Sequence, residues 1–165
     1  MAVPCTEHIF LTGRKGVGKS TLLRAMLAGK RLGGFFTLRS TAVFDRPSIH
    51  LLRAAEGERP SAGNLVCFCG ERDTARFDRL GTAALAESPA CDVIVMDELG
   101  PAEEAAKGFQ AAVLAALDGG TPVYGVLQQA DSAFLRRVAA HPRVRVITVT
   151  EENRDALRRQ LCAEK

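Results

Sequence analysis

The strongest constraint on this chain is an eight-residue run near its start, Gly13-Arg14-Lys15-Gly16-Val17-Gly18-Lys19-Ser20. The run matches G-x-x-x-x-G-K-[ST] at every fixed position, between an apolar stretch at 8–12 and a helix-like stretch at 19–28. Glycines at these positions let successive N–H groups turn inward and form an anion nest. In this strand-to-helix context the run predicts a Walker A phosphate loop, and the alternative is a generic glycine turn before a helix.

Each residue of the run has an expected role toward a nucleoside triphosphate. Lys19 supplies a point charge for the β- and γ-phosphates, and the Ser20 hydroxyl is a ligand for Mg²⁺. Thr21 falls in the first helical turn, near the α-phosphate, where the positive helix end adds to the attraction. We therefore predict that the nucleotide is bound along Gly13 to Thr21. Arg14 and Lys15 are interpreted as solvated charges at the loop tip.

A second candidate element is an acidic pair that follows an apolar run. Residues 92–96 form a nearly continuous apolar stretch, which indicates a strand buried on both faces, and Asp97 and Glu98 come next. Ligands of parallel sheets gather beyond the carboxyl ends of the strands. We assign Asp97 to Mg²⁺ and Glu98 to the attacking water. The reversed assignment, or a solvated Asp-Glu turn, remains an alternative.

The order of elements predicts an α/β fold. We expect strands at 8–12, 35–38, 92–96, 123–127 and 144–149, and helices at 19–28, 77–87, 103–117, 133–140 and 153–161. This alternation implies right-handed crossovers and a parallel sheet with helices on both faces, a three-layer α/β/α sandwich. The segment from about 39 to 70 differs, because short strands at 41–44, 48–52 and 65–68 indicate an antiparallel, hairpin-rich insertion. It is too short to stand alone, so residues 1–165 are predicted to form a single domain.

Composition indicates a cytoplasmic protein. The formal net charge is only +3 and the basic residues are scattered among acids, so nucleic acid is not indicated as a partner. No apolar stretch approaches the roughly 20 residues of a membrane span, and Glu7 and His8 interrupt any signal-peptide pattern. The five cysteines offer one close pair, Cys67 and Cys69, which is read as reduced thiols in preference to a metal or redox site.

Several segments together resemble a known family. They are GRKGVGKST, GGFFT, VIVMDELGPAE, TPVYGVL and VTEENRDAL, with Phe-Asp-Arg-Leu-Gly at 77–81 before the acidic strand. In order and spacing the chain is similar to the small nucleoside-triphosphatases first described from thermophiles, also called the cancer-related NTPase family. That resemblance implies a P-loop NTPase fold with an added strand between the loop strand and the acidic strand. It also implies slow hydrolysis of several nucleoside triphosphates, with Glu98 as the water-activating acid.

The chain departs from the family pattern at two places. Family loops often carry proline where this chain has Lys15, and the segment 39–70 matches poorly, with a loop at 56–63 that looks peculiar to this protein. Any substrate preference carried by this segment is therefore left open.

Two further residues are candidates for contact with the nucleotide. Arg154 follows the last predicted strand, in a loop that lies near the base or the phosphates in such folds. The alternatives are an N-cap role for Asn153 and a surface ion pair for Arg154. Gln128 follows the strand at 123–127, where related folds place a polar residue that senses the γ-phosphate.

Three functions are compatible with these features. The leading hypothesis is a Mg²⁺-dependent hydrolase of ATP, GTP and other nucleoside triphosphates, with catalytic Lys19 and Glu98 and without an evident base preference. A second is a small-molecule or nucleotide kinase, whose arginine lid would come from Arg136, Arg137, Arg143 and Arg145. A third is a nucleotide-dependent switch, in which hydrolysis times the binding of a partner or of nucleic acid at residues 33–70. The sequence does not identify a protein partner.

Overall fold

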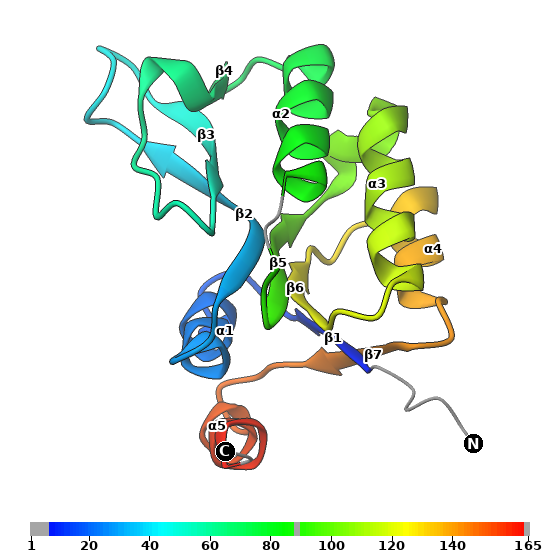
Figure 1. The fold of residues 1–165 in the computed structure, drawn as a ribbon. Helices are drawn as coiled ribbons and strands as arrows, with labels where there is room; N and C mark the ends of the chain where they lie inside the picture. Colours follow the sequence, from blue (N-terminus) through cyan, green and yellow to red (C-terminus); the bar gives the residue numbers. More distant parts are fainter. Residues whose placement is uncertain (1–6, 88–89, 164–165) are drawn as a thin grey trace.

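A seven-stranded mixed sheet organises the chain (Figure 1). The computed structural model describes residues 7–87 and 90–163. The sheet order is β4-β3-β2-β5-β6-β1-β7. Its strands are β1 (His8–Thr12), β2 (Leu32–Ser40), β3 (Ser48–Arg53), β4 (Leu65–Phe68), β5 (Val93–Leu99), β6 (Val123–Leu127) and β7 (Val144–Thr148). Strands β2, β5, β6, β1 and β7 pair in parallel, and β3 and β4 are antiparallel. The mostly parallel sheet, its antiparallel insertion and the added strand β6 between β1 and β5 are confirmed.

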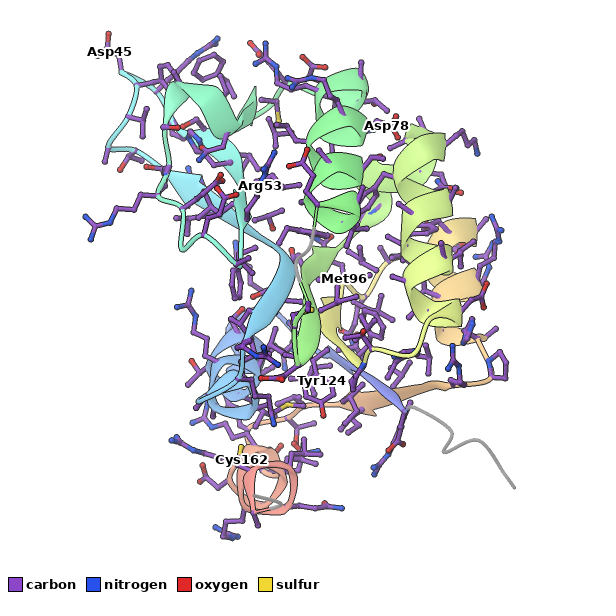
Figure 2. All side chains as sticks on the ribbon, viewed as in Figure 1. Asp45, Arg53, Asp78, Met96, Tyr124 and Cys162 are labelled. Carbon is purple, nitrogen blue, oxygen red and sulfur yellow. The ribbon has the colours of Figure 1, made fainter. Side chains whose placement is uncertain are left out.

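Helices cover both faces of the sheet, which confirms the three-layer α/β/α arrangement (Figures 1 and 2). On one face α1 (Lys19–Leu27) and α5 (Arg154–Cys162) close a core that includes Leu23 and Val95. On the other face α2 (Thr74–Ala86), α3 (Lys107–Asp118) and α4 (Ala133–Ala139) close a core around Met96 and Phe109. Two short 3₁₀ turns, η1 (Ala62–Asn64) and η2 (Pro101–Ala105), complete the elements. Within the described residues, the helices are too short or too polar to cross a membrane.

The strand predicted at 41–44 is wrong. Strand β2 runs on to Ser40, where it pairs with Ser48 of β3, and residues 41–46 form the bend between them. The Ser40 hydroxyl accepts a hydrogen bond from the Ala42 N–H at 3.1 Å and so supports that bend. The ring of Phe44 contacts Phe68 edge-on, with centroids 5.1 Å apart. Phe44 therefore packs against the sheet without extending a strand.

Two helices begin at different residues from those predicted. Helix α2 begins at Thr74 and not at 77, because the Asp73 carboxylate caps it and accepts the Arg76 N–H at 2.9 Å. Helix α3 begins at Lys107 and not at 103, because the preceding residues form η2.

Strand β5 extends past the predicted end at residue 96 to Leu99, so the acidic pair lies within the last residues of the strand.

The segment 77–81 lies within α2 and packs against α3. The rings of Phe77 and Phe109 pack edge to face with centroids 4.9 Å apart. A Cβ at Gly81 would lie 2.5 Å from the Phe109 ring, so only glycine permits this approach of the two helices. The Asp78 Oδ1 accepts the Phe109 N–H at 2.7 Å, while Ala106, the N-cap of α3, offers no side-chain cap. Asp78 thus caps α3 from the neighbouring helix (Figure 2).

We expect Asp78→Ala to lower the free energy of unfolding by about 1 to 2 kcal/mol, the usual cost of a lost helix cap. The neighbouring exposed residue gives a matched control, because Arg79→Ala is expected to change stability by less than about 0.5 kcal/mol. Urea unfolding followed by circular dichroism measures both. Equal stability of the two variants would contradict the proposed cap.

Candidate active site

The phosphate loop has the backbone conformation that its glycines predict. Gly13, Gly16 and Gly18 have φ angles of +146°, +81° and +102°, which side-chain-bearing residues rarely adopt. A Cβ at Gly13 would lie 2.5 Å from the carbonyl oxygen of Val149, which follows β7. The loop is therefore held against the end of β7 at a point where no side chain fits.

The loop opens onto a cleft of about 730 Å³. The predicted nucleotide-binding residues that line it are Gly13, Arg14, Lys15, Gly16, Gly18, Lys19, Ser20 and Thr21. Val17 does not line the cleft, because its side chain is buried beneath the loop in the α1 core. The Lys19 ammonium donates to the carbonyl oxygens of Gly13 at 2.7 Å and Arg14 at 2.9 Å. The lysine is thus held across its own loop, beside the place where phosphates would lie.

Glu98 reaches the same cleft through an irregularity in β5. Asp97 pairs with Val126 of β6, but the next pair is Leu99 with Leu127, so Glu98 is an extra residue in the ladder. Such bulges re-aim side chains. The peptide bond between Asp97 and Glu98 is cis. The irregular register explains how two neighbouring acids both lie at the site, Asp97 buried and Glu98 half-buried.

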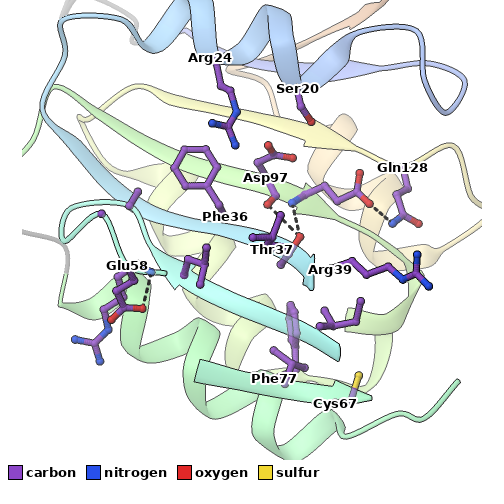
Figure 3. A pocket seen from close by; sticks show the side chains of 18 of the residues that line it. Ser20, Arg24, Phe36, Thr37, Arg39, Glu58, Cys67, Phe77, Asp97 and Gln128 are labelled. Atoms are coloured by element: carbon purple, nitrogen blue, oxygen red, sulfur yellow. Dashed lines mark hydrogen bonds between the residues drawn. The ribbon is translucent and has the colours of Figure 1, made fainter. Parts of the chain in front are cut away.

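Thr37 holds the acidic pair in place, a role that the sequence analysis missed (Figure 3). Its hydroxyl donates to the Asp97 carbonyl oxygen at 3.2 Å and accepts the Glu98 N–H at 3.3 Å. Strand β2, which carries Thr37, pairs in parallel with β5 up to Asp97. The only available signal was the position of this threonine directly after the GGFF run of β2. Its partner is sixty residues away, and no local pattern identifies it.

The environment of Asp97 opposes its ionisation. Burial, followed by the nearby charge of Glu98, raises the pKa of Asp97 to about 6. The charge of Arg24, a hydrogen bond with Ser20 and the charge of Lys19 partly counter this rise. A carboxylate kept in a buried site at this cost is typical of a ligand-binding position. The contact with Ser20 brings together the two predicted metal ligands.

Gln128 contacts the predicted catalytic acid. Its side-chain amide donates a hydrogen bond to the Glu98 carboxylate, and its backbone N–H donates to the Leu99 carbonyl oxygen at 2.9 Å. Gln128 and the neighbouring Gln129, which the sequence analysis did not single out, both line the phosphate cleft. The amide therefore orients Glu98, and contact with the γ-phosphate stays a prediction.

Arg154 lies beside the phosphate cleft and not within it. It lines a separate hollow of about 160 Å³ with Gly18 and Thr21, and its guanidinium donates to the Val17 carbonyl oxygen at 3.3 Å. Asn153 is the N-cap residue of α5, but its side chain makes no cap hydrogen bond. Its amide instead accepts the Thr150 N–H at 2.7 Å and shapes the loop after β7.

Comparison with known proteins assigns this site to a family. A family model described as NTPase matches residues 8–162. The chain belongs to this NTPase family. Nucleoside-triphosphatase THEP1 of Thermofilum pendens is 29% identical, over 96% of this chain and 94% of the relative. The cancer-related nucleoside-triphosphatase homolog of Bos taurus is also 29% identical, over 92% of each chain. The resemblance inferred from the sequence is therefore confirmed.

Solved structures show the same fold in other members. The crystal structure of THEP1 from Aquifex aeolicus superposes with a TM-score of 0.73 at 22% identity, over 96% of this chain and 99% of that one. The solution structure of a human cancer-related nucleoside triphosphatase gives a TM-score of 0.65 at 26% identity, over 96% and 97%. The P-loop NTPase fold class predicted from the sequence is confirmed.

We expect Asp97→Asn to stabilise the nucleotide-free NTPase at neutral pH. The raised pKa means that folding favours the protonated carboxyl, so Asp97 costs stability as pH rises from about 4 through about 6. A shift of this size corresponds to as much as about 3 kcal/mol above pH 6, and asparagine avoids that cost. Urea unfolding at pH 4.5 and pH 8 should show the advantage of the variant growing with pH. An advantage that is the same at both pH values would contradict this account.

Proposed function

We propose that this protein hydrolyses nucleoside triphosphates to diphosphates and phosphate with Mg²⁺, in the cytoplasm and as one domain. The observation that carries the proposal is that the phosphate loop and Glu98 line one cleft. Membership of the NTPase family supports hydrolysis of the phosphoanhydride. Substrates would be ATP, GTP and other nucleoside triphosphates, because the described cleft presents phosphate-binding groups and no base-reading motif.

The triphosphate would be held by the chain's own groups from Gly13 to Thr21. Residues of the loop and the start of α1 line the cleft, and their backbone N–H groups would bind the β- and γ-phosphates. Lys19 would exchange its contacts with loop carbonyls for phosphate oxygens as negative charge develops. Thr21 and Arg154 line the adjacent hollow, on the side where the α-phosphate and the nucleoside would continue.

Ser20 and Asp97 fit a Mg²⁺ site. A hydroxyl and a carboxylate are the hard oxygen ligands that this ion prefers. Here the two contact one another, and Ser20 lines the cleft. Among the described residues, no group of three His, Cys, Asp or Glu side chains could hold a metal by itself. The bound ion would share its coordination with phosphate oxygens and waters, and would neutralise charge on the leaving diphosphate.

Glu98 would orient and deprotonate the attacking water. As the new bond from water oxygen to the γ-phosphorus forms, the bond from that phosphorus to the β–γ bridging oxygen breaks. The water proton passes to the Glu98 carboxylate, which accepts a hydrogen bond from Gln128, while Thr37 holds the Glu98 backbone N–H.

The arginines considered for a kinase lid lie elsewhere. Arg136 pairs with Asp131, and Arg143 donates to the Gly119 carbonyl oxygen at 2.8 Å, where it caps the end of α3. Neither these nor Arg137 and Arg145 line the phosphate cleft in the described part of the chain. The geometry therefore favours hydrolysis over transfer beneath an arginine lid.

Lys19→Ala should abolish turnover while leaving the fold intact. Loss of the charge that meets the developing phosphate oxyanions is expected to cost at least about two orders of magnitude, roughly 3 kcal/mol. Phosphate release from ATP, GTP, CTP and UTP measures the effect, and circular dichroism checks the fold. A folded variant with near-normal turnover would remove the central role of the loop.

Glu98→Gln and Asp97→Asn should separate the two acids. Glu98→Gln is expected to keep nucleotide affinity and lower turnover by roughly 10²- to 10⁴-fold, as for a lost general base. Asp97→Asn should instead raise the Mg²⁺ concentration needed for half-maximal activity. The readouts are nucleotide binding by calorimetry and phosphate release over a Mg²⁺ titration. The opposite pattern would reverse the assignment, and no effect of either change would refute the acidic pair as the site.

A further inference from the structure

The two ends of the phosphate cleft adjoin different hollows. At one end Glu98 and Gln128 also line a cavity of about 830 Å³ beside the antiparallel insertion (Figure 3). At the other end Gly18 and Thr21 also line the hollow of about 160 Å³ that contains Arg154, here called the α5 hollow. In the proposed function Glu98 lies at the γ-phosphate and Thr21 near the α-phosphate. The nucleoside therefore leaves the cleft at Thr21, where the α5 hollow begins.

The α5 hollow lies between the first turn of α1 and the first half of α5 (Figure 1). From α1 it is lined by Thr21, which is exposed, and by Leu22, which is buried. From α5 it is lined by Arg154 and Arg158, which lie one turn apart and so share a face of the helix, and by Asp155. An aliphatic side chain on one wall and arginine side chains on the other suit the two flat faces of a ring.

Helix α5 is fixed against the phosphate loop. Leu157 and Leu161 pack against the core that α1 closes. The Arg154 guanidinium donates to the Val17 carbonyl oxygen at 3.3 Å, and a Cβ at Gly18 would lie 3.7 Å from the Arg154 side chain. The walls of the hollow are therefore in place before a ligand binds.

Arg158 lines this hollow without a partner of its own. Within the described part of the chain it makes no hydrogen bond or ion pair, and it is exposed. A guanidinium is planar and stays charged at working pH, so it can stack on a base that enters the hollow. Arg154, in contrast, is engaged by the loop.

The hollow suits one ring held by its faces. Its volume of about 160 Å³ is well below the roughly 300 to 1,000 Å³ of pockets that enclose a whole drug-sized ligand. Distinguishing one base from another requires hydrogen-bonding groups that are held at the base edge. Asp155 is exposed and has no ion-pair partner among the described residues, so it is not held in one position for that purpose. Stacking remains, and every base has a π-face.

We propose that the α5 hollow is the base subsite and that Arg158 stacks on the base of the bound triphosphate. The base would lie between the Arg158 guanidinium and the turn of α1 that carries Thr21 and Leu22. Such a subsite accepts ATP, GTP, CTP and UTP alike, and it favours nucleotides over inorganic tripolyphosphate, which has no ring. The inference rests on the proposed function, because that function decides which end of the cleft holds the α-phosphate.

Calorimetry on the full chain tests the binding step. The ligands are the β,γ-imido analogues of the four nucleoside triphosphates, and inorganic tripolyphosphate, each with Mg²⁺. Arg158→Met should weaken all four analogues by a similar factor, roughly three- to tenfold, and leave the Kd of tripolyphosphate unchanged. Arg159→Met is the matched control, because it removes the same charge from the next residue, which is exposed and does not line the hollow. It should change none of these Kd values.

Arg158→Lys separates stacking from charge. Lysine keeps the positive charge and loses the plane, so this variant should bind the analogues as weakly as Arg158→Met. Binding like the unaltered chain would overturn the proposal, because charge alone would then suffice. Two further results would also overturn it. One is an unchanged Kd for all four analogues in folded Arg158→Met, and the other is an equal loss of tripolyphosphate binding, which would indicate a phosphate contact. Circular dichroism checks the fold of each variant.

Steady-state phosphate release tests the same residue during turnover. A base contact is equal in the ground state and the transition state, so Arg158→Met should raise KM and leave kcat unchanged. A lower kcat at unchanged KM would contradict a role confined to the base. Absence of hydrolysis by the unaltered chain would refute the proposed function alone, since the calorimetric loss on Arg158→Met would still be measurable.

Discussion

The parallel pairing of β6 with both β1 and β5 is the interaction on which the site depends. Because β6 lies in register between these strands, the loop after β1 and the acids of β5 reach the same edge of the sheet. Gly125 of β6 makes this close packing possible. A Cβ there would lie 2.5 Å from the Met96 carbonyl oxygen and 2.7 Å from the Phe10 ring. Phe10 and Met96 are fully buried, so neither can give way.

The site holds its two acids at different depths, and that difference suits their proposed roles. Asp97 stays in the regular ladder and is buried beside Ser20, where ionisation is costly unless a cation arrives. Glu98 is displaced from the ladder and faces the cleft, held by Thr37 from below and by Gln128 from the side. A metal ligand and a base for water can therefore be adjacent in sequence without competing for one position.

The sequence predicted those parts of the fold that depend on local pattern. The phosphate loop and the apolar strands β1 and β6 are visible because glycine spacing and continuous apolar runs are properties of short segments. The strand predicted at 41–44 is wrong, because this stretch is a bend whose Phe44 packs on Phe68. The cap from Asp78, the bulge at Glu98 and the support from Thr37 could not be predicted, because each joins residues distant in sequence. Position at a strand end identified Glu98 as a candidate, but the bulge that aims it appears only in the register.

Strand β2 joins the acidic pair of β5 to the antiparallel insertion. Its residues 32–36 pair in parallel with β5, and its residues 35–40 pair antiparallel with β3. Thr37 follows the parallel part and contacts the backbone of both acids. Phe36 lies at the junction, in register with Asp97 on one side and with Leu52 on the other. A change in the insertion that shifts β2 therefore acts on the same strand that holds the backbone of Asp97 and Glu98. The antiparallel insertion and the proposed hydrolytic site are in this way joined through a single strand.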